Sequence, residues 1–149
     1  MHMIDMRSET TTAFGISATL SGVTPSAGNI VDLTDYQAAT FLYQTGAVTD
    51  AGAAGGFTVE VQHSDTTAAA DFAAVADADL VGEESDLAVT ADDVDSVAVG
   101  SIGYIGSKRY VRVVVTGTTN TDAVVNGVWA LQKPRYAPKG DAAANIAAT

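Results

Sequence analysis

Alternation of apolar and polar residues with a period of two is the strongest pattern in this sequence. It is clearest at residues 57–63, where Phe57, Val59 and Val61 alternate with polar residues. A period of two places successive side chains on opposite faces of an extended strand, so that one face can be buried while the other meets water. The pattern therefore predicts a strand here, and weaker versions of it predict strands at residues 13–20, 29–33, 39–45 and 97–104.

Two further strands are predicted at residues 106–116 and 126–136, joined by a polar turn at residues 117–122. Two strands separated by a short polar turn predict a β-hairpin. Pro134 is expected to end the second strand, because proline has no N–H to donate to a neighbouring strand. The residues expected in the core are Val111, Val113 and Val115 on the first strand, and Val125, Trp129 and Leu131 on the second.

About seven or eight short strands separated by turn-forming residues predict an all-β fold, a small antiparallel β-sandwich or barrel. We expect the β-sandwich domain at residues 13–136, an extended N-terminal arm at residues 1–12 and an extended C-terminal arm at residues 137–149. The arms show no hydrophobic period, so they are expected to become ordered only on another subunit or a larger assembly.

Composition and charge exclude several classes of function. The 149 residues include no Cys, which excludes a disulfide scaffold, thiol catalysis and zinc held by cysteines. The net charge of −11 opposes binding to the phosphate backbone of nucleic acids. No apolar run reaches the ~18 residues of a membrane helix, and residues 1–9 lack the apolar core of a signal peptide. We therefore expect a protein made in the cytoplasm that binds neither nucleic acid nor a membrane.

Four segments contain residue types found in catalytic or ligand sites, and each has a simpler interpretation. Residues 63–65 (His-Ser-Asp) are consecutive, whereas a catalytic triad converges from separated positions, so a turn is favoured. Residues 92–95 lack the alternating ligands of a Ca²⁺ loop, and residues 83–86 have no partner for acid–base chemistry, which favours solvated acidic segments. Residues 52–56 lack the Lys-Ser/Thr of a phosphate loop. We expect no cofactor, no metal and no enzymatic activity.

Aromatic residues leave a carbohydrate site open as an alternative. A platform of exposed rings would stack on a sugar, although core packing with the hydroxyl reaching the surface is the commoner use of tyrosine. The residues concerned are Tyr36, Tyr43, Tyr104, Tyr110, Trp129 and Tyr136.

Basic residues are concentrated in the two strands predicted at residues 106–116 and 126–136, which hold five of the seven in the chain. They could bind phosphate, but an acidic protein surface, such as a neighbouring subunit, is the better partner for a basic region on an acidic protein. The alternative is a solvated face with surface ion pairs worth at most ~1 kcal/mol each. The candidate partner-binding residues are Arg7, Lys108, Arg109, Arg112, Lys133, Arg135 and Lys139.

Residues 103–113 (Gly-Tyr-Ile-Gly-Ser-Lys-Arg-Tyr-Val-Arg-Val), together with residues 57–65 and 128–135, resemble the head decoration or cement proteins of tailed bacteriophages. These are small structural proteins encoded near the major capsid protein, and the resemblance covers roughly residues 28–138. A strand ending in Ser-Asp and an Arg-Tyr-Val-Arg-Val strand also occur in discoidin-like carbohydrate-binding sandwiches. In this sequence no Trp follows the Ser-Asp turn, and Phe72 lies nearby instead.

The resemblance implies a virion structural protein on the outer surface of the capsid, where it bridges subunits of the major capsid protein. Binding many capsid copies at once would gain strength through multivalency. Closed symmetry and the three-fold positions of capsids lead us to expect a homotrimer, with both arms ordered on the capsid or on neighbouring copies. The family brings no catalytic motif. Two alternatives remain open: a carbohydrate-binding module on the virion surface, and a head–tail connector or tail component.

Overall fold

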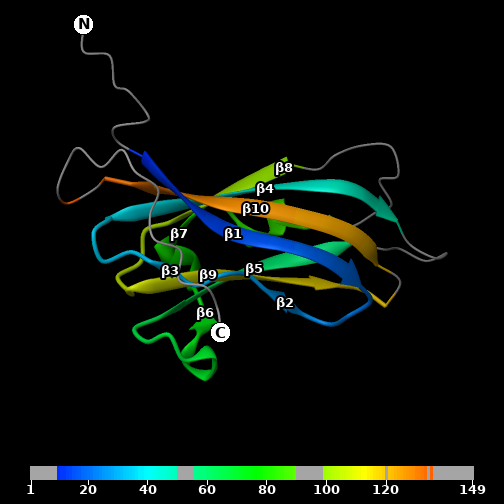
Figure 1. The fold of residues 1–149 in the computed structure, drawn as a ribbon, viewed down its shortest axis with the longest axis horizontal. Coiled ribbons are helices and arrows are strands. Elements are labelled where there is room, and N and C mark those ends of the chain that lie inside the picture. Colours follow the sequence, from blue (N-terminus) through cyan, green and yellow to red (C-terminus); the bar gives the residue numbers. More distant parts are fainter. Residues whose placement is uncertain (1–9, 50–55, 90–98, 120, 134, 136–149) are drawn as a thin grey trace, which may run out of the picture.

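Two antiparallel β-sheets packed face to face form the protein (Figure 1). The computed structural model describes residues 10–49, 56–89, 99–119, 121–133 and 135. Sheet A has the strand order β1-β10-β4-β8-β7, and sheet B has the order β2-β9-β5-β6, with β3 also paired to β9. The two sheets do not close into a barrel. The expected all-β sandwich is therefore confirmed, and the barrel alternative is not formed.

The three longest strands, β1, β4 and β10, all belong to sheet A. The bounds of the strands are β1 (Thr10–Ser21), β2 (Ser26–Ala27), β3 (Val31–Asp32), β4 (Ala38–Thr49), β5 (Phe57–Ser64), β6 (Ala73–Ala74), β7 (Leu80–Val81), β8 (Val99–Tyr104), β9 (Tyr110–Gly117) and β10 (Asp122–Gln132). Three short 3₁₀ helices lie between β5 and β8, namely η1 (Ala69–Asp71), η2 (Asp77–Asp79) and η3 (Glu84–Leu87).

The strands predicted at residues 13–20, 39–45 and 57–63 are confirmed, and each is longer than expected. β1 begins at Thr10, which pairs with Gln132, so residues 10–12 belong to sheet A and not to an arm. The strand expected at residues 29–33 is only the two-residue β3. Residues 1–9 and 136–149, which include most of both expected arms, lie outside the described residues.

The predicted hairpin of β9 and β10 is wrong, because the two strands belong to different sheets. β9 pairs with β5 in sheet B, whereas β10 lies between β1 and β4 in sheet A. Thr121 holds the crossing between the sheets: its side-chain oxygen accepts the N–H of Thr118 at 2.8 Å, and its hydroxyl donates to the carbonyl of Gly56. Both strands bury their apolar face, and in a sandwich those faces meet across the core instead of lying side by side.

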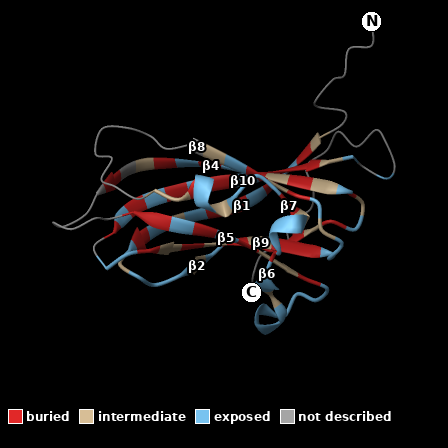
Figure 2. Ribbon diagram, turned by 180° about the vertical axis from the view of Figure 1, so that it is seen from behind, coloured by how far each residue is buried: buried red, intermediate tan, exposed pale blue. Residues whose placement is uncertain are grey.

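The core lies between the two sheets, where buried residues line the strands of both layers (Figure 2). All six residues expected there from the two strands, three valines on β9 and Val125, Trp129 and Leu131 on β10, are fully buried. Aromatic rings fill the centre: Trp129 lies 5.2 Å from Phe41 and Tyr43 lies 6.0 Å from Phe57, between ring centroids. Such pairs add stability beyond the area that they bury.

Two glycines make room for these rings in sheet A. Gly127 on β10 and Gly100 on β8 are the direct cross-strand neighbours of Tyr43 on β4. A Cβ atom at Gly127 would lie 2.4 Å from Cζ of Phe41, and one at Gly100 would lie 2.5 Å from Cε1 of Tyr43. Gly127 thus leaves space for the Phe41 ring, and Gly100 leaves space for the Tyr43 ring. The hydroxyl of Tyr43 donates to the carbonyl of Leu87 at 2.8 Å.

We predict that Gly127→Ala lowers the free energy of unfolding by about 1–3 kcal/mol, the usual cost of overpacking a core. The added methyl group would meet the Phe41 ring, which is completely buried. Urea unfolding measures the change. Gly46→Ala on β4 is the matched control, because its Cβ would meet its nearest neighbour at an ordinary 3.9 Å. Equal effects of the two substitutions would contradict this explanation.

Candidate partner-binding end of the sandwich

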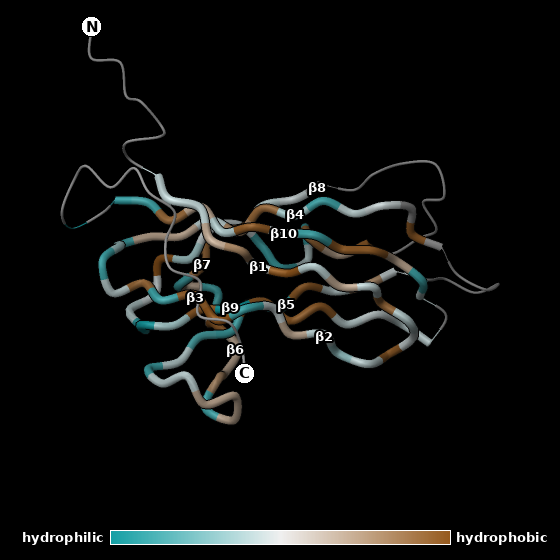
Figure 3. Tube along the Cα trace, in the orientation of Figure 1, coloured by the Kyte–Doolittle hydropathy of each residue, from teal (hydrophilic) through white to brown (hydrophobic). Residues whose placement is uncertain are grey.

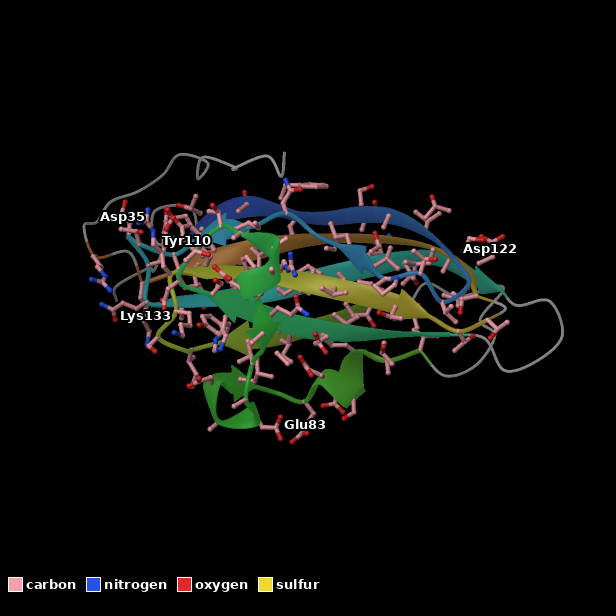
Figure 4. All side chains as sticks on the ribbon, turned by 90° about the horizontal axis from the view of Figure 1, so that it is seen from below. Asp35, Glu83, Tyr110, Asp122 and Lys133 are labelled. Atoms are coloured by element: carbon pink, nitrogen blue, oxygen red, sulfur yellow. The ribbon has the colours of Figure 1, made fainter. Side chains whose placement is uncertain are left out.

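Four basic residues gather at one end of the sandwich, which we call the basic end and define as Lys108, Arg109, Lys133 and Arg135. Lys108 and Arg109 come directly before β9, and Lys133 and Arg135 come shortly after β10. Figure 4 shows Lys133, Asp35 and Tyr110 at this end and Asp122 at the opposite end. β1 also begins here, so the N-terminal and C-terminal segments both leave the domain from the basic end.

Backbone hydrogen bonds hold this end together. The N–H of Leu33 donates to the carbonyl of Arg109 at 2.8 Å, and the N–H of Arg135 donates to the carbonyl of Asp35 at 2.8 Å. The buried side chains of Leu33 and Tyr36 anchor the loop between these two contacts in the core. The result is a cleft of about 460 Å³ whose lining includes Lys108, Arg109 and Arg135.

Asp32 fixes the position of Arg109. Nη2 of Arg109 lies 2.7 Å from Oδ2 of Asp32, and its Nε donates to Oδ1 at 3.1 Å. Thr34 donates its hydroxyl and its N–H to the same carboxylate, at 2.6 Å and 2.9 Å. Burial on its own would raise the pKa of Asp32, but the hydrogen bonds from Arg109 and Thr34 together outweigh it and lower the pKa.

The other basic residues differ in their surroundings. Lys108 forms an ion pair with Asp65 on the surface. Lys133 and Arg135 are exposed and form no ion pair with another described residue. Lys108 and Arg109 thus have acidic partners within the chain, whereas Lys133 and Arg135 present their charge outward.

Arg112 does not belong to the basic end. It lies on the outer face of sheet B, where its Nε and Nη2 donate to Oε1 of Gln62 at 2.9 Å and 2.7 Å. Its guanidinium also lies 4.2 Å from the ring centroid of Phe72, a cation–π contact that holds the segment after β5 against β9. Arg7 and Lys139, the remaining candidates, lie outside the described residues.

His63 and Ser64 end strand β5, and the chain bends at Asp65, so the predicted turn begins after Ser64 and the three residues form no triad. Nδ1 of His63 lies 3.1 Å from the hydroxyl of Tyr104, and Oγ of Ser64 accepts the N–H of Thr66 at 3.0 Å. Asp65 pairs with Lys108, so the three side chains contact three separate partners. This geometry cannot pass a proton from the serine through the histidine to the carboxylate.

Glu84 differs from the solvated carboxylate expected at residues 83–86. Its Oε1 accepts the N–H of Val61 at 2.6 Å, so the side chain from η3 satisfies a backbone donor of β5. Burial raises the pKa of Glu84, the Val61 N–H partly offsets this, and the negative charges of Glu60 and Asp77 raise the pKa further. Sequence reasoning missed this contact because it joins residues that are 23 positions apart.

The described residues contain no group of three His, Asp or Glu side chains placed to hold a metal ion. Residues 92–95, considered above for Ca²⁺, and residues 52–55 of the glycine-rich segment lie outside the described residues. The aromatic platform does not form among the described candidates: Tyr36, Tyr43, Tyr104, Tyr110 and Trp129 are each at most 8% exposed. Tyr136 lies outside the described residues.

The outer face of sheet A is a second candidate surface, which was not predicted from the sequence. Hydrophobic and hydrophilic stretches are interspersed along the strands of both sheets (Figure 3). On β1, β10 and β4, however, the outward positions include Phe14, Val128 and Leu42, which are 41%, 43% and 42% exposed. The signal in the sequence was the scarcity of charged residues in these three strands, where alternation alone predicts charged or polar outward positions.

No helix in the described part of the chain is long and apolar enough to cross a membrane. No protein-family model matches the chain, and a search among curated proteins finds no match.

We predict that Asp32→Asn lowers the free energy of unfolding at pH 7 by at most about 1 kcal/mol, because Arg109 loses a charged partner at the surface. Since the folded-state pKa of Asp32 is lowered, its contribution is present above the ordinary value of 3.8 and is lost as the pH falls through the lowered pKa. Urea unfolding of both proteins at pH 7 and near pH 2 measures this. The exposed Asp86→Asn serves as control, and a difference that persists unchanged in acid would refute the ion-pair explanation.

Glu84→Gln should have the opposite dependence on pH. A raised folded-state pKa means that the contribution of Glu84 is complete below its ordinary value of 4.5 and is lost as the pH rises through the raised pKa. The glutamine side chain of the variant keeps an oxygen for the Val61 N–H and never ionises. Relative to wild type, the variant should therefore gain stability between pH 4 and pH 7, by less than about 1 kcal/mol because the carboxyl is only partly buried. Exposed Glu83→Gln should show no such gain, and a loss for Glu84→Gln at pH 7 would show that the sign is wrong.

Proposed function

We propose that this protein is a virion structural protein that binds the outer surface of a tailed-phage capsid and stabilises it by bridging neighbouring copies of the major capsid protein. The resemblance of residues 57–65, 103–113 and 128–135 to head decoration proteins motivates the proposal. The observation that carries it is the position of the basic end, at which Thr10 and Gln132 pair and both terminal segments leave the domain.

This arrangement suits a protein that attaches through one end. Two segments of nine and fourteen residues start beside each other, so both can reach the same supporting surface. Lys133 and Arg135 lie at their base and present positive charge on a chain whose net charge is −11. An acidic patch on a capsid subunit would attract this end and repel the rest of the molecule, which orients the protein during attachment.

The capsid would be stabilised by added contacts between its subunits and not by a chemical reaction. A domain that contacts two neighbouring capsid subunits adds a contact that must break before the subunits separate under the outward pressure of a packaged genome. Many copies bound to one shell multiply this effect, although each contact is weak. The proposal needs no catalytic group, cofactor or metal.

The double variant Lys133→Gln/Arg135→Gln should bind genome-free shells of the phage that encodes this protein about tenfold more weakly than wild type. Binding is measured by co-sedimentation, at low and high salt. The matched control is Thr24→Glu/Thr119→Glu, which changes the net charge by the same amount but at exposed positions near the Asp122 end. Equal weakening by both pairs would mean that only net charge matters.

Deletion of residues 1–9 tests the contribution of the N-terminal segment without removing any of β1. We expect weaker binding to the shells with an unchanged far-ultraviolet circular dichroism spectrum. If wild-type protein does not bind the shells at all, the proposed function fails. Labelling of intact virions then separates the shell from the head–tail connector and the tail, the alternative positions.

A further inference from the structure

The outer face of sheet A carries almost no charge, although the protein as a whole is strongly acidic. We call this surface the open face and define it by the outward-facing residues of β1, β10, β4, β8 and β7. Asp122, at the far end of β10, is the one charged residue among those that the structure describes on it. Near the middle the outward residues are apolar, small or amide, such as Phe14, Ser17 and Asn126. Antiparallel sheets that face water usually place charged residues at such positions.

An apolar row crosses the open face at right angles to the strands. Phe14 on β1 is the direct neighbour of Val128 on β10, and Val128 is the direct neighbour of Leu42 on β4. All three side chains are between 41% and 43% exposed. Beside this row lies a groove of about 610 Å³, whose lining includes Leu42, Asn126 and Ser101. The same face therefore offers both a projecting ring and a groove.

The outer face of sheet B provides the contrast. Glu60 and Arg112 are charged there, and the segment that carries β6 packs against its edge through Arg112 and Phe72. The described residues of the chain place no comparable segment over the open face. Contiguous exposed apolar residues of this kind mark interaction surfaces.

We propose that the open face binds the open face of a second copy of this chain, forming a two-fold symmetric dimer. Two chains that each carry a net charge of −11 repel one another over most of their surfaces. On the open face the described residues would oppose a single pair of like charges, the two copies of Asp122 at the far end of β10, whereas other surfaces carry many more acidic residues.

The available area is sufficient for such a dimer. The five strands of sheet A, β1, β10, β4, β8 and β7, have 12, 11, 12, 6 and 2 residues. With a rise of about 3.4 Å per residue and a spacing of about 4.8 Å between strands, they give a face of roughly 700 Å². Stable interfaces of standard size bury about 600–1,000 Å² per partner, so this area lies within their range. Two sheet faces pack with their strands within about 30° of each other, as the two layers of a sandwich do.

A two-fold axis that runs along β10 makes the face self-complementary. Rotation about this axis places Val128 against Val128 of the second copy, and it places Phe14 over Leu42 of the second copy, next to the groove. Each Phe14 ring thereby meets the groove of the other chain, as an interface that is the same for both subunits requires. The rotation also keeps both basic ends on the same side of the dimer.

This inference does not rest on the proposed function, and it can be tested on the isolated protein without any capsid. A face-to-face contact closes as a dimer. It therefore competes with the trimer expected from the resemblance, and a measured mass distinguishes the two.

The first experiment measures the mass of the protein by sedimentation equilibrium at roughly 100 µM, above the micromolar dissociation constants of weak interfaces of this size. Wild type should have twice the chain mass of 15.1 kDa, and Val128→Lys should have the mass of one chain. Val114→Lys is the matched control, because Val114 is an outward-facing valine on the central strand β9 of sheet B, and this variant should remain a dimer.

Leu42→Lys provides a second variant of the open face, in case Val128→Lys alters the fold, and both are checked by circular dichroism. A second experiment mixes Val128→Lys with Val128→Asp. Because the proposed axis places the two residues against each other, the mixture should recover the dimer that each variant alone has lost. A monomeric or trimeric wild type, a dimer that survives both lysine substitutions, or a mixture that stays monomeric would overturn the proposal.

Discussion

The packing of aromatic rings against glycines between the two sheets is the constraint on which the rest of this structure depends. Phe41, Tyr43 and Trp129 all project from the middle of sheet A into the core. Three large rings on adjacent strands fit only because Gly127 and Gly100 leave space beside them. Sheet B then needs mainly β-branched residues to complete the core, and β9 supplies a buried valine at every second position from Val111. Large rings in sheet A and smaller valines in sheet B together fill the space between the two sheets.

This division of the core has consequences for both outer surfaces. Sheet A holds the rings through its three long strands β1, β10 and β4, which also give it a broad outer face. Sheet B has short strands, and the acidic segment after β5 returns to its edge, where Glu84 binds the N–H of Val61 and Val89 pairs with Phe57. The exposed edge of β5 is therefore covered from within the chain, which is one of the ways in which β-proteins avoid edge-to-edge aggregation. Most acidic residues of this covering segment are exposed to solvent.

Local sequence patterns predicted features that depend on residues close in the sequence, such as the buried face of a strand or a turn. They did not predict which distant strands pair. The alternation at β5 and β9 placed the core valines correctly, and the Ser64-Asp65 turn followed from the turn preferences of these residues. The pairing of β9 with β5 instead of β10 could not be predicted, because both strands have a buried apolar face and a short polar connection suits either a hairpin or a crossing between sheets. The groove on sheet A was equally hidden, because it depends on which strands are neighbours. The clustering of basic residues in the last third of the chain was visible in the sequence, but the separation of Arg112 from them follows from the pleat of β9 and its contact with Gln62.

The basic end and the open face differ in the forces that they offer to a partner, and this separates their roles. Attraction through Lys133 and Arg135 acts at a distance and is screened by salt, with a Debye length of about 8 Å at physiological ionic strength. Burial of Phe14, Val128 and Leu42 acts only on contact and does not depend on screening of charges. Thr10 begins β1 and Gln132 ends β10, and both strands belong to sheet A, which carries the open face. If two open faces join about an axis parallel to these strands, the two basic ends therefore lie on the same side of the dimer. Such a pair would hold a charged surface at two points, so the second contact forms at the high effective concentration that the first one sets.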